Sequence, residues 1–140
     1  MNWNSFDRGV FLVNCLAIVY NPKTKMILIG KRESDTYVKE LEWSFPGGRP
    51  TYDQSLEDSL KKEVKKKTGL DVEIKQLIFA RIPSELNEQV LLYYYTEQTG
   101  GKEKAGEKFV EIKWIRPTEI AKYSNTTVDS TVVKFLKQLK

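Results

Sequence analysis

The sequence contains no histidine and only one cysteine, Cys15. The absence of histidine excludes Ser-His-Asp triads, histidine general bases and histidine-ligated zinc. A single thiol forms no internal disulfide, which suits a reducing compartment. Cys15 itself stands in the apolar run VFLVNCLAIVY, where we expect a buried core thiol rather than a nucleophile.

Long apolar runs are also missing from the chain. The run Val10–Tyr20 is too short to span a bilayer, and the beginning MNWNSFDRG lacks the basic region of a signal peptide. These two observations predict a soluble, cytoplasmic protein with no membrane partner.

What the sequence does contain is typical of one folded unit. Its 140 residues suit a single domain over residues 1–140, and 40% hydrophobic with 30% charged residues are ordinary proportions for a globular protein. The net charge of +4 is slight, so it permits an anionic ligand or nucleic acid without requiring either.

Apolar and β-branched runs predict strands along much of the chain. Val10–Tyr20 and Met26–Arg32 are separated by the turn-forming segment NPKTK, which predicts a hairpin. A loop is expected over residues 34–40, and an irregular, turn-rich backbone over residues 42–50, where two glycines and two prolines gather. Three later strands are predicted: Val72–Ile82, Gln89–Thr96 and Lys108–Ile115. The segment EQTGGKEKAGEK, before the last of them, is predicted to be a mobile, charged loop.

Two amphipathic helices complete the expected elements. The first begins at Ser55, which together with Asp58 resembles a capping box, and ends at Gly69. The second closes the chain. Their predicted apolar stripes are Leu56, Leu60 and Val64 in the first helix, and Val128, Val132, Phe135, Leu136 and Leu139 in the second.

The order of these elements carries a family resemblance. A strand hairpin, then PGG, then a helix ending in glycine and a hydrophobe is similar to the Nudix hydrolase family over nearly the whole chain. The family signature is G, five residues, E, seven residues, then R-E-hydrophobic-x-E-E-x-G-hydrophobic. Starting at Gly48, this spacing reaches Gln54 and Lys62 and ends at Gly69 and Leu70; LIGKR and EIKWI also look like family strands. The resemblance implies an α/β/α sandwich in which a mixed β-sheet lies between helices.

The resemblance also implies a chemistry. In the family, glutamates of this helix hold Mg²⁺ or Mn²⁺ against the diphosphate of a nucleoside-diphosphate-linked substrate, and water attacks phosphorus. Carried across by position, Glu63 is the catalytic and metal-binding residue. The other three signature glutamates fall on Gln54, Lys66 and Lys67, and the signature arginine becomes Lys62. We therefore expect metal binding at Glu63 to be weak or absent.

Helix geometry explains this expectation. At about 100° per residue, one arc beside the apolar stripe carries Ser59, Glu63, Lys66 and Lys67. At an effective dielectric of about 20, an ammonium about 5 Å from a divalent cation repels it by roughly 6–7 kcal/mol. An ammonium can instead neutralise a phosphate directly, so ligand binding can outlast metal-dependent catalysis.

The substrate-binding residues predicted from position are Arg32, Gly47, Gly48, Lys62, Lys66 and Lys67. Simpler interpretations stand beside these. Glu63 can form salt bridges with the lysines three and four positions later, and Lys61 and Lys65 belong to a solvated face. The two glycines can serve backbone geometry, through positive φ and close packing against the helix. Aromatic side chains are expected in the core rather than as platforms for a base: Trp43, Phe45 and Trp114. Tyr93–Tyr95 alternate across a strand, so one or two of them could face a ligand groove.

Three functions follow from the sequence. The first is a Nudix-like protein that binds a nucleotide or nucleoside-diphosphate-linked compound, with hydrolysis lost or residual. The second is an active Mg²⁺- or Mn²⁺-dependent pyrophosphohydrolase that takes ligands from outside the signature helix, where the candidates are Asp53, Glu57, Glu85, Glu88, Glu107 and Glu111. The third is an RNA-binding or protein-interaction module. A homodimer, common in the family, is compatible with all three.

Overall fold

The computed structural model describes residues 8–33, 43–84, 86–123 and 129–139. The loop predicted over residues 34–40 lies outside these ranges, as does Val128. In chain order the elements are β1 (Leu12–Asn21), β2 (Met26–Arg32), β3 (Trp43–Ser44), β4 (Gly47–Gly48), α1 (Leu56–Thr68), β5 (Leu70–Arg81), β6 (Gln89–Gly101), β7 (Phe109–Ile115), the 3-10 helix η2 (Pro117–Lys122) and α2 (Ser130–Lys137).

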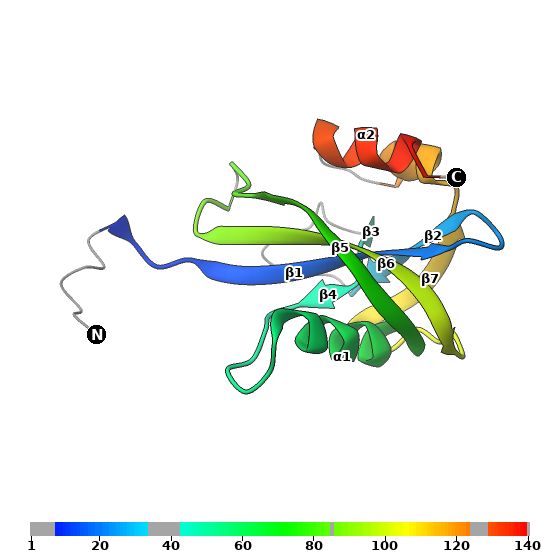
Figure 1. Ribbon diagram of the computed structural model, residues 1–140, viewed down its shortest axis with the longest axis horizontal. Helices are drawn as coiled ribbons and strands as arrows, with labels where there is room; N and C mark the ends of the chain where they lie inside the picture. Colours follow the sequence, from blue (N-terminus) through cyan, green and yellow to red (C-terminus); the bar gives the residue numbers. More distant parts are fainter. Residues whose placement is uncertain (1–7, 34–42, 85, 124–128, 140) are drawn as a thin grey trace.

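The strands form one seven-stranded sheet between two helical layers. Its order is β3-β2-β1-β6-β5, with β4 also pairing with β1 and β7 with β2. The β1–β6 pair is parallel and the other pairs are antiparallel, so the sheet is mixed. Figure 1 shows α1 on one side of the sheet and α2 on the other. The predicted α/β/α sandwich is confirmed, and so is the β1–β2 hairpin.

Helix α1 begins and ends where its capping residues predict. The Ser55 side chain accepts a hydrogen bond from the Asp58 backbone N–H at 3.1 Å, and Gly69 ends the helix in the left-handed region at φ 76°. The predicted stripe is wrong at Leu56, whose exposed fraction is 40%, because this residue lies in the first turn, outside the buried part of the helix.

The buried face of α1 includes two small polar residues that the predicted stripe did not contain. Ser59 and Thr68 are buried together with Leu60 and Val64. The Ser59 hydroxyl accepts from the Thr51 N–H at 3.3 Å, and the Thr68 hydroxyl donates to the Val64 carbonyl at 2.7 Å. These hydrogen bonds remove the cost of burying the two hydroxyls.

Each face of the sheet carries its own hydrophobic cluster. Leu60 and Val64 of α1 pack on Cys15, Ala17 and Leu28, among others. Burial raises the pKa of the Cys15 thiol, and its predicted place in the core is confirmed. On the opposite face, the α2 side chains pack on strand residues and on η2: Val132 and Leu136 against Ile18, Ile27, Ile29, Tyr93, Ile115 and Ile120.

Several strand boundaries differ from the sequence prediction by one or more residues, and two of these differences are coupled. Strand β5 begins at Leu70, and β6 continues to Gly101, five residues into the segment predicted as a loop. The two extensions pair with each other, Leu70 with Gly101 and Asp71 with Gly100. Backbone hydrogen bonds between distant segments therefore override a polar, glycine-containing composition that locally favours a loop.

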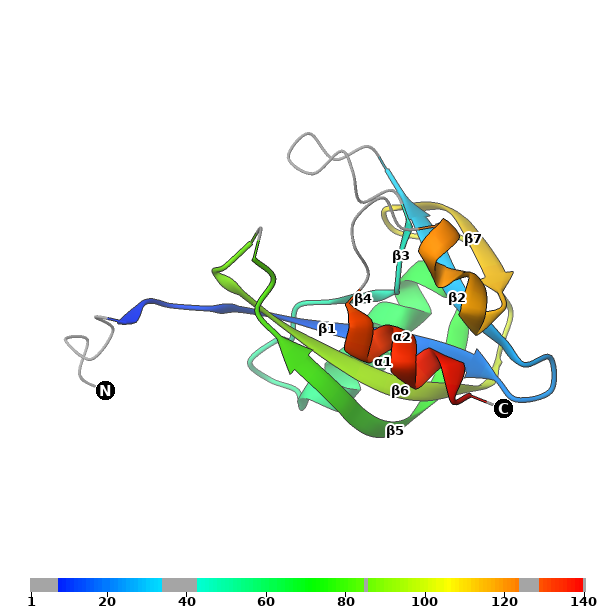
Figure 2. The same ribbon diagram turned by 90° about the horizontal axis from the view of Figure 1, so that it is seen from above.

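Among the described residues, neither α-helix has the length and apolar character needed to cross a membrane. Helix α2 has only eight residues, with Asp129 as its N-cap: the carboxylate accepts from the Thr131 N–H at 2.8 Å. Its apolar face agrees with the predicted closing helix, although Leu139 lies beyond the helix end. Because α2 is short, it covers only part of its face of the sheet (Figure 2).

Candidate functional site

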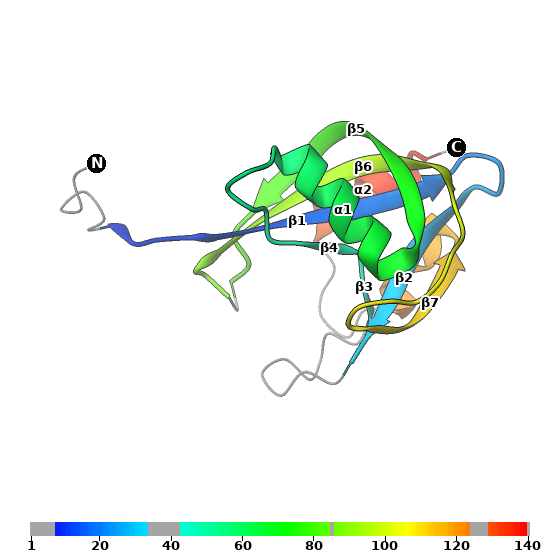
Figure 3. The same ribbon diagram turned by 90° about the horizontal axis from the view of Figure 1, so that it is seen from below.

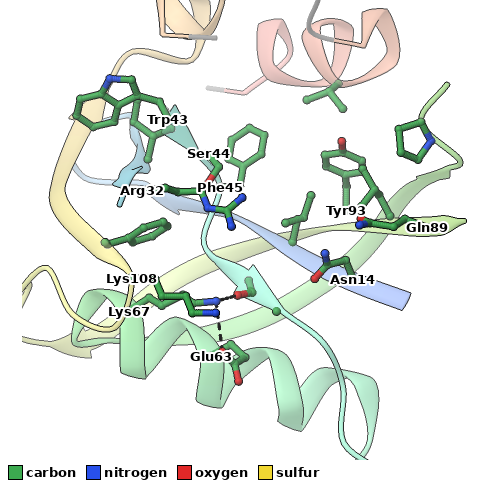
Figure 4. Close-up of a pocket in the computed structure, with 18 of the residues that line it drawn as sticks. Asn14, Arg32, Trp43, Ser44, Phe45, Glu63, Lys67, Gln89, Tyr93 and Lys108 are labelled. Carbon is green, nitrogen blue, oxygen red and sulfur yellow. Dashed lines mark hydrogen bonds and ion pairs between the residues drawn. The ribbon is translucent and has the colours of Figure 1, made fainter. Parts of the chain in front are cut away.

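A cavity of about 660 Å³ lies beside α2 and reaches across the sheet edge to α1. It receives side chains from most elements of the fold (Figure 4). The charged lining residues are Arg32, Arg49, Lys67, Arg81 and Lys108, with Glu63, Glu107 and Asp129. The aromatic lining residues are Trp43, Phe45, Tyr93, Phe109 and Tyr123. The cavity thus combines a charged portion with aromatic walls, as small-molecule sites commonly do.

The glycine pair of β4 allows α1 side chains to reach this cavity. Gly47 pairs with Leu16 of β1, and a Cβ atom at Gly47 would lie 2.0 Å from the Cys15 carbonyl oxygen. A Cβ atom at Gly48 would lie 2.9 Å from the Glu63 carboxyl group. Neither glycine has a positive φ, so that part of the sequence expectation is wrong. Close approach is the reason these positions need glycine: Gly47 lies against the β1 backbone, and Gly48 lies against the Glu63 side chain of α1.

Lys67 of α1 reaches β4 and lines the cavity. Only 15% of its side chain is exposed, and its Nζ donates a hydrogen bond to the Gly47 carbonyl and lies 3.4 Å from Glu63 Oε2. Lys66 Nζ lies 3.7 Å from the other oxygen of Glu63, but 55% of the Lys66 side chain is exposed. The predicted salt bridges from Glu63 to both lysines are confirmed. The structure separates the two lysines: Lys67 lines the cavity, whereas Lys66 does not.

The donor set at this point does not suit Mg²⁺ or Mn²⁺. These ions require several oxygen ligands, and the Lys67 ammonium already engages the Gly47 carbonyl and the Glu63 carboxylate. Within the described residues, no three histidine, cysteine, aspartate or glutamate side chains converge as a metal-binding group. A metal site at Glu63 would need further carboxylate ligands, but the neighbouring group is the Lys67 ammonium.

Lys108 also lines the cavity, and sequence reasoning missed it as a site residue. Its loop caps the C-terminal end of α1: the Lys104 N–H donates to the Thr68 carbonyl at 2.8 Å and the Gly106 N–H to the Lys67 carbonyl at 3.0 Å. Lys108 follows with a positive φ of 66°, which is costly for a residue with a Cβ. The only sequence signal at Lys108 is its position at the boundary between a charged loop and a predicted strand.

Comparison with protein families places this geometry in context. The NUDIX domain model matches residues 10–138, which is most of the chain. The chain belongs to the Nudix family.

Solved structures show the same fold. A NUDIX hydrolase from Nitrosomonas europaea has a TM-score of 0.77 at 17% identity, over 93% of this chain and 72% of that protein. A MutT protein from Methanosarcina mazei Go1 has a TM-score of 0.69 at 18% identity, over 93% of both chains. An ADP-ribose pyrophosphatase from Streptococcus suis has a TM-score of 0.64 at 20% identity, over 91% of this chain and 86% of that one. A comparison with curated proteins finds no significant match.

Some of the site residues predicted from the family resemblance line the cavity, and others do not. The cavity is lined by Arg32, Gly47, Gly48, Glu63 and Lys67. Lys62 is exposed and does not line it, and Gln54 lies outside it, accepting a hydrogen bond from the Thr51 hydroxyl at 3.5 Å. The structure therefore brings Lys67, rather than the whole lysine run, to the predicted site.

Of the outer carboxylates proposed as replacement ligands, Glu107 lines the cavity. Glu85 lies outside the described residues. The others are exposed and do not line it: Asp53, Glu57, Glu88 and Glu111. A hydrogen bond from the Thr51 side chain is the main cause that lowers the pKa of Asp53, so this perturbation is local to the turn before α1.

Aromatic side chains serve both the core and the cavity. Trp43 and Phe45 pack against the α2-side cluster, as expected, but they also line the cavity. Trp114 packs against the other cluster, and its indole N–H donates to Glu103 at 3.1 Å. Tyr93 faces the cavity while Tyr94 belongs to the α1-side cluster, which confirms the predicted alternation.

Proposed function

We propose that this Nudix protein binds a nucleotide or nucleoside-diphosphate-linked compound in the cavity, with metal-dependent pyrophosphohydrolysis lost or residual. The observation that carries the proposal is Lys67, whose ammonium group is held by the Gly47 carbonyl and Glu63. Glu63 balances this charge, but the cavity lining as a whole has five basic and three acidic side chains, so its positive excess can neutralise a phosphate group without a metal ion.

The surrounding charges support the same proposal. Figure 4 shows Arg32, Lys67 and Lys108 directed into one cavity. Their chemistry is complementary, because a guanidinium offers a planar fork of donors to phosphate oxygens and an ammonium offers a compact charge. Both hydrogen bonds and charge–charge interactions are stronger in a partly enclosed site than in bulk water. One of the similar structures is named an ADP-ribose pyrophosphatase, which is consistent with a diphosphate ligand.

Isothermal calorimetry without metal tests the proposal. We expect ADP or a sugar nucleotide to bind in EDTA, and Lys67→Met to weaken binding about tenfold or more, since a charge-assisted hydrogen bond contributes about 1.5–3 kcal/mol. Lys61→Met is the matched control, because Lys61 is exposed on the same helix and does not line the cavity. The proposal fails if nucleotides, sugar nucleotides and dinucleotides all leave the calorimeter signal flat.

Glu107 favours one alternative, residual metal-dependent hydrolysis, because it is a second carboxylate in the same cavity as Glu63. The test is hydrolysis of nucleoside-diphosphate-linked compounds in Mg²⁺ and in Mn²⁺, followed as formation of the nucleoside monophosphate, because cleavage of the diphosphate bridge yields two phosphomonoesters. Under this alternative, Glu63→Gln and Glu107→Gln each reduce turnover. Turnover that is absent in the wild type, or unchanged in both variants, eliminates it.

A further inference from the structure

The cavity has a second polar group of residues, away from its lysines. Asn14 of β1 and Gln89 of β6 both line it, and Figure 4 shows them beside Tyr93, on the other side of the view from Lys67 and Lys108. The parallel register pairs Leu12 with Gln89 and Asn14 with Leu91. Residues two apart on a strand share a face, so both amides lie on the same face of the sheet.

These two amide side chains have no hydrogen-bond partner in the part of the chain that the structure describes. Both are half-buried. An amide carries a carbonyl acceptor and an NH₂ donor, and burying these without partners is unfavourable. The lysine end differs, because Lys67 already has its hydrogen bond and ion pair. The amides therefore offer neutral donors and acceptors at the end of the cavity away from Lys67 and Lys108.

The walls beside the amides are flat, and their rings are held in place. The Tyr93 ring lies 5.5 Å from the Phe79 ring at 28°, and 6.4 Å from the Phe45 ring at 87°. Its hydroxyl accepts a hydrogen bond from Arg81 Nε at 3.3 Å. Leu91, which pairs with Asn14, adds apolar lining there. A flat ligand group would lose little by entering, since these walls are already ordered.

We propose that the Asn14–Gln89 amide pair recognises a nucleobase, a flat heterocycle with a donor and an acceptor on one edge. This inference rests on the proposed function and deepens it: the diphosphate lies towards Lys67 and Lys108, and the base lies at the amide end. An amide pairs with such an edge through two hydrogen bonds, and each pair of this kind discriminates between bases. The protein should therefore select among nucleotides by their base.

The experiment compares base-free and base-containing ligands by calorimetry in EDTA. The probes are inorganic pyrophosphate and the diphosphates of adenosine, guanosine, cytidine and uridine. The wild type should bind at least one nucleoside diphosphate about tenfold more tightly than pyrophosphate and should distinguish among the four. This comparison needs no variant, so it does not depend on a mutant that folds.

The variant arm assigns the effect to the amides. Asn14→Leu with Gln89→Met keeps similar side-chain sizes but removes the amide groups. We expect this double variant to lose the nucleoside preference while retaining the wild-type affinity for pyrophosphate. Gln76→Met is the matched control, because Gln76 is exposed and does not line the cavity.

Two results overturn this inference and leave the proposed function standing. The first is equal affinity for pyrophosphate and all four nucleoside diphosphates. The second is a nucleoside preference that persists in the double variant while Lys67→Met abolishes binding. No binding of any of these anions overturns the proposed function, and this inference with it.

Discussion

The two faces of the sheet differ in how completely their helices cover them. On one face, α1 crosses the strands (Figure 3). There Leu60 and Val64 pack against Cys15 and Ala17 and close the cluster. On the other face, the eight-residue α2 leaves a cavity of about 660 Å³. The α1 face is therefore closed by packing alone, whereas the α2 face combines a hydrophobic cluster with an open cavity. Gly47 and Gly48 form the seam through which α1 contributes to the cavity.

Truncation of a core leucine on each face is the strongest test of this division. Leu60→Ala should lower the free energy of unfolding by about 3–5 kcal/mol, because its surroundings are closed and cannot fill the space. Leu136→Ala should cost less, about 2–3 kcal/mol, because Val132 one turn earlier borders the cavity and the site can relax. Urea denaturation measures both. A larger loss at Leu136 would contradict the division.

The glycine seam should be more sensitive at its first position than at its second. A Cβ at Gly47 meets backbone at 2.0 Å, which cannot move without disturbing β1, whereas a Cβ at Gly48 meets the end of the Glu63 side chain. We expect Gly47→Ala to cost about 3 kcal/mol of stability and Gly48→Ala about 1 kcal/mol. Thermal or urea unfolding provides the measurement. Equal costs would mean that β4 moves away from the β1 backbone as easily as the Glu63 side chain moves away from Gly48.

Restoring a carboxylate at position 67 should create a metal site that spans the seam. Lys67→Glu would place a second carboxylate beside Glu63 and the Gly47 carbonyl, and we expect Mn²⁺ affinity to rise about tenfold, equivalent to about 1.4 kcal/mol. Lys66→Glu is the internal control and should raise it less, because that side chain is largely exposed. The double variant should bind at least as well as Lys67→Glu.

Titration with Mn²⁺ at low salt measures these affinities. Unchanged Mn²⁺ affinity in Lys67→Glu would show that Lys67 does not occupy a metal position. Glutamates near the end of α1 oppose the helix dipole at about 0.3–1 kcal/mol each, so unfolding should be followed in parallel.

The smallest expected effect concerns the two lysines with positive φ. Lys25 in the β1–β2 turn has φ 65° and Lys108 has φ 66°. Glycine adopts this conformation without strain, so Lys25→Gly and Lys108→Gly should each raise stability by about 0.5–1 kcal/mol after the entropy of glycine is counted. Only Lys108→Gly should weaken nucleotide binding in calorimetry. Weaker binding in both variants, or in neither, would remove Lys108 from the site.

Local chemistry made much of this fold predictable. Ser55 and Gly69 mark the ends of α1 because capping depends on residues next to each other in sequence. The hairpin follows from a turn segment between two apolar runs, and the signature spacing from Gly48 to Gly69 led to the Nudix fold. The stripe was wrong at Leu56 and the loop was wrong before Gly101, since burial and strand pairing there depend on distant segments.

The sequence by itself therefore determined the fold, the replacement of three signature glutamates and the positive charge of the signature helix. Only the tertiary structure decided that Lys67 enters the cavity while Lys66 remains at the surface, although the two are neighbours in the chain. It also brought Lys108 to the same cavity and set Asn14 beside Gln89. The physical reason is that helix periodicity fixes the direction in which each side chain projects from α1. The positions of the neighbouring elements, which are the seam, the capping loop and the parallel β1–β6 pair, decide which of these side chains reach the cavity.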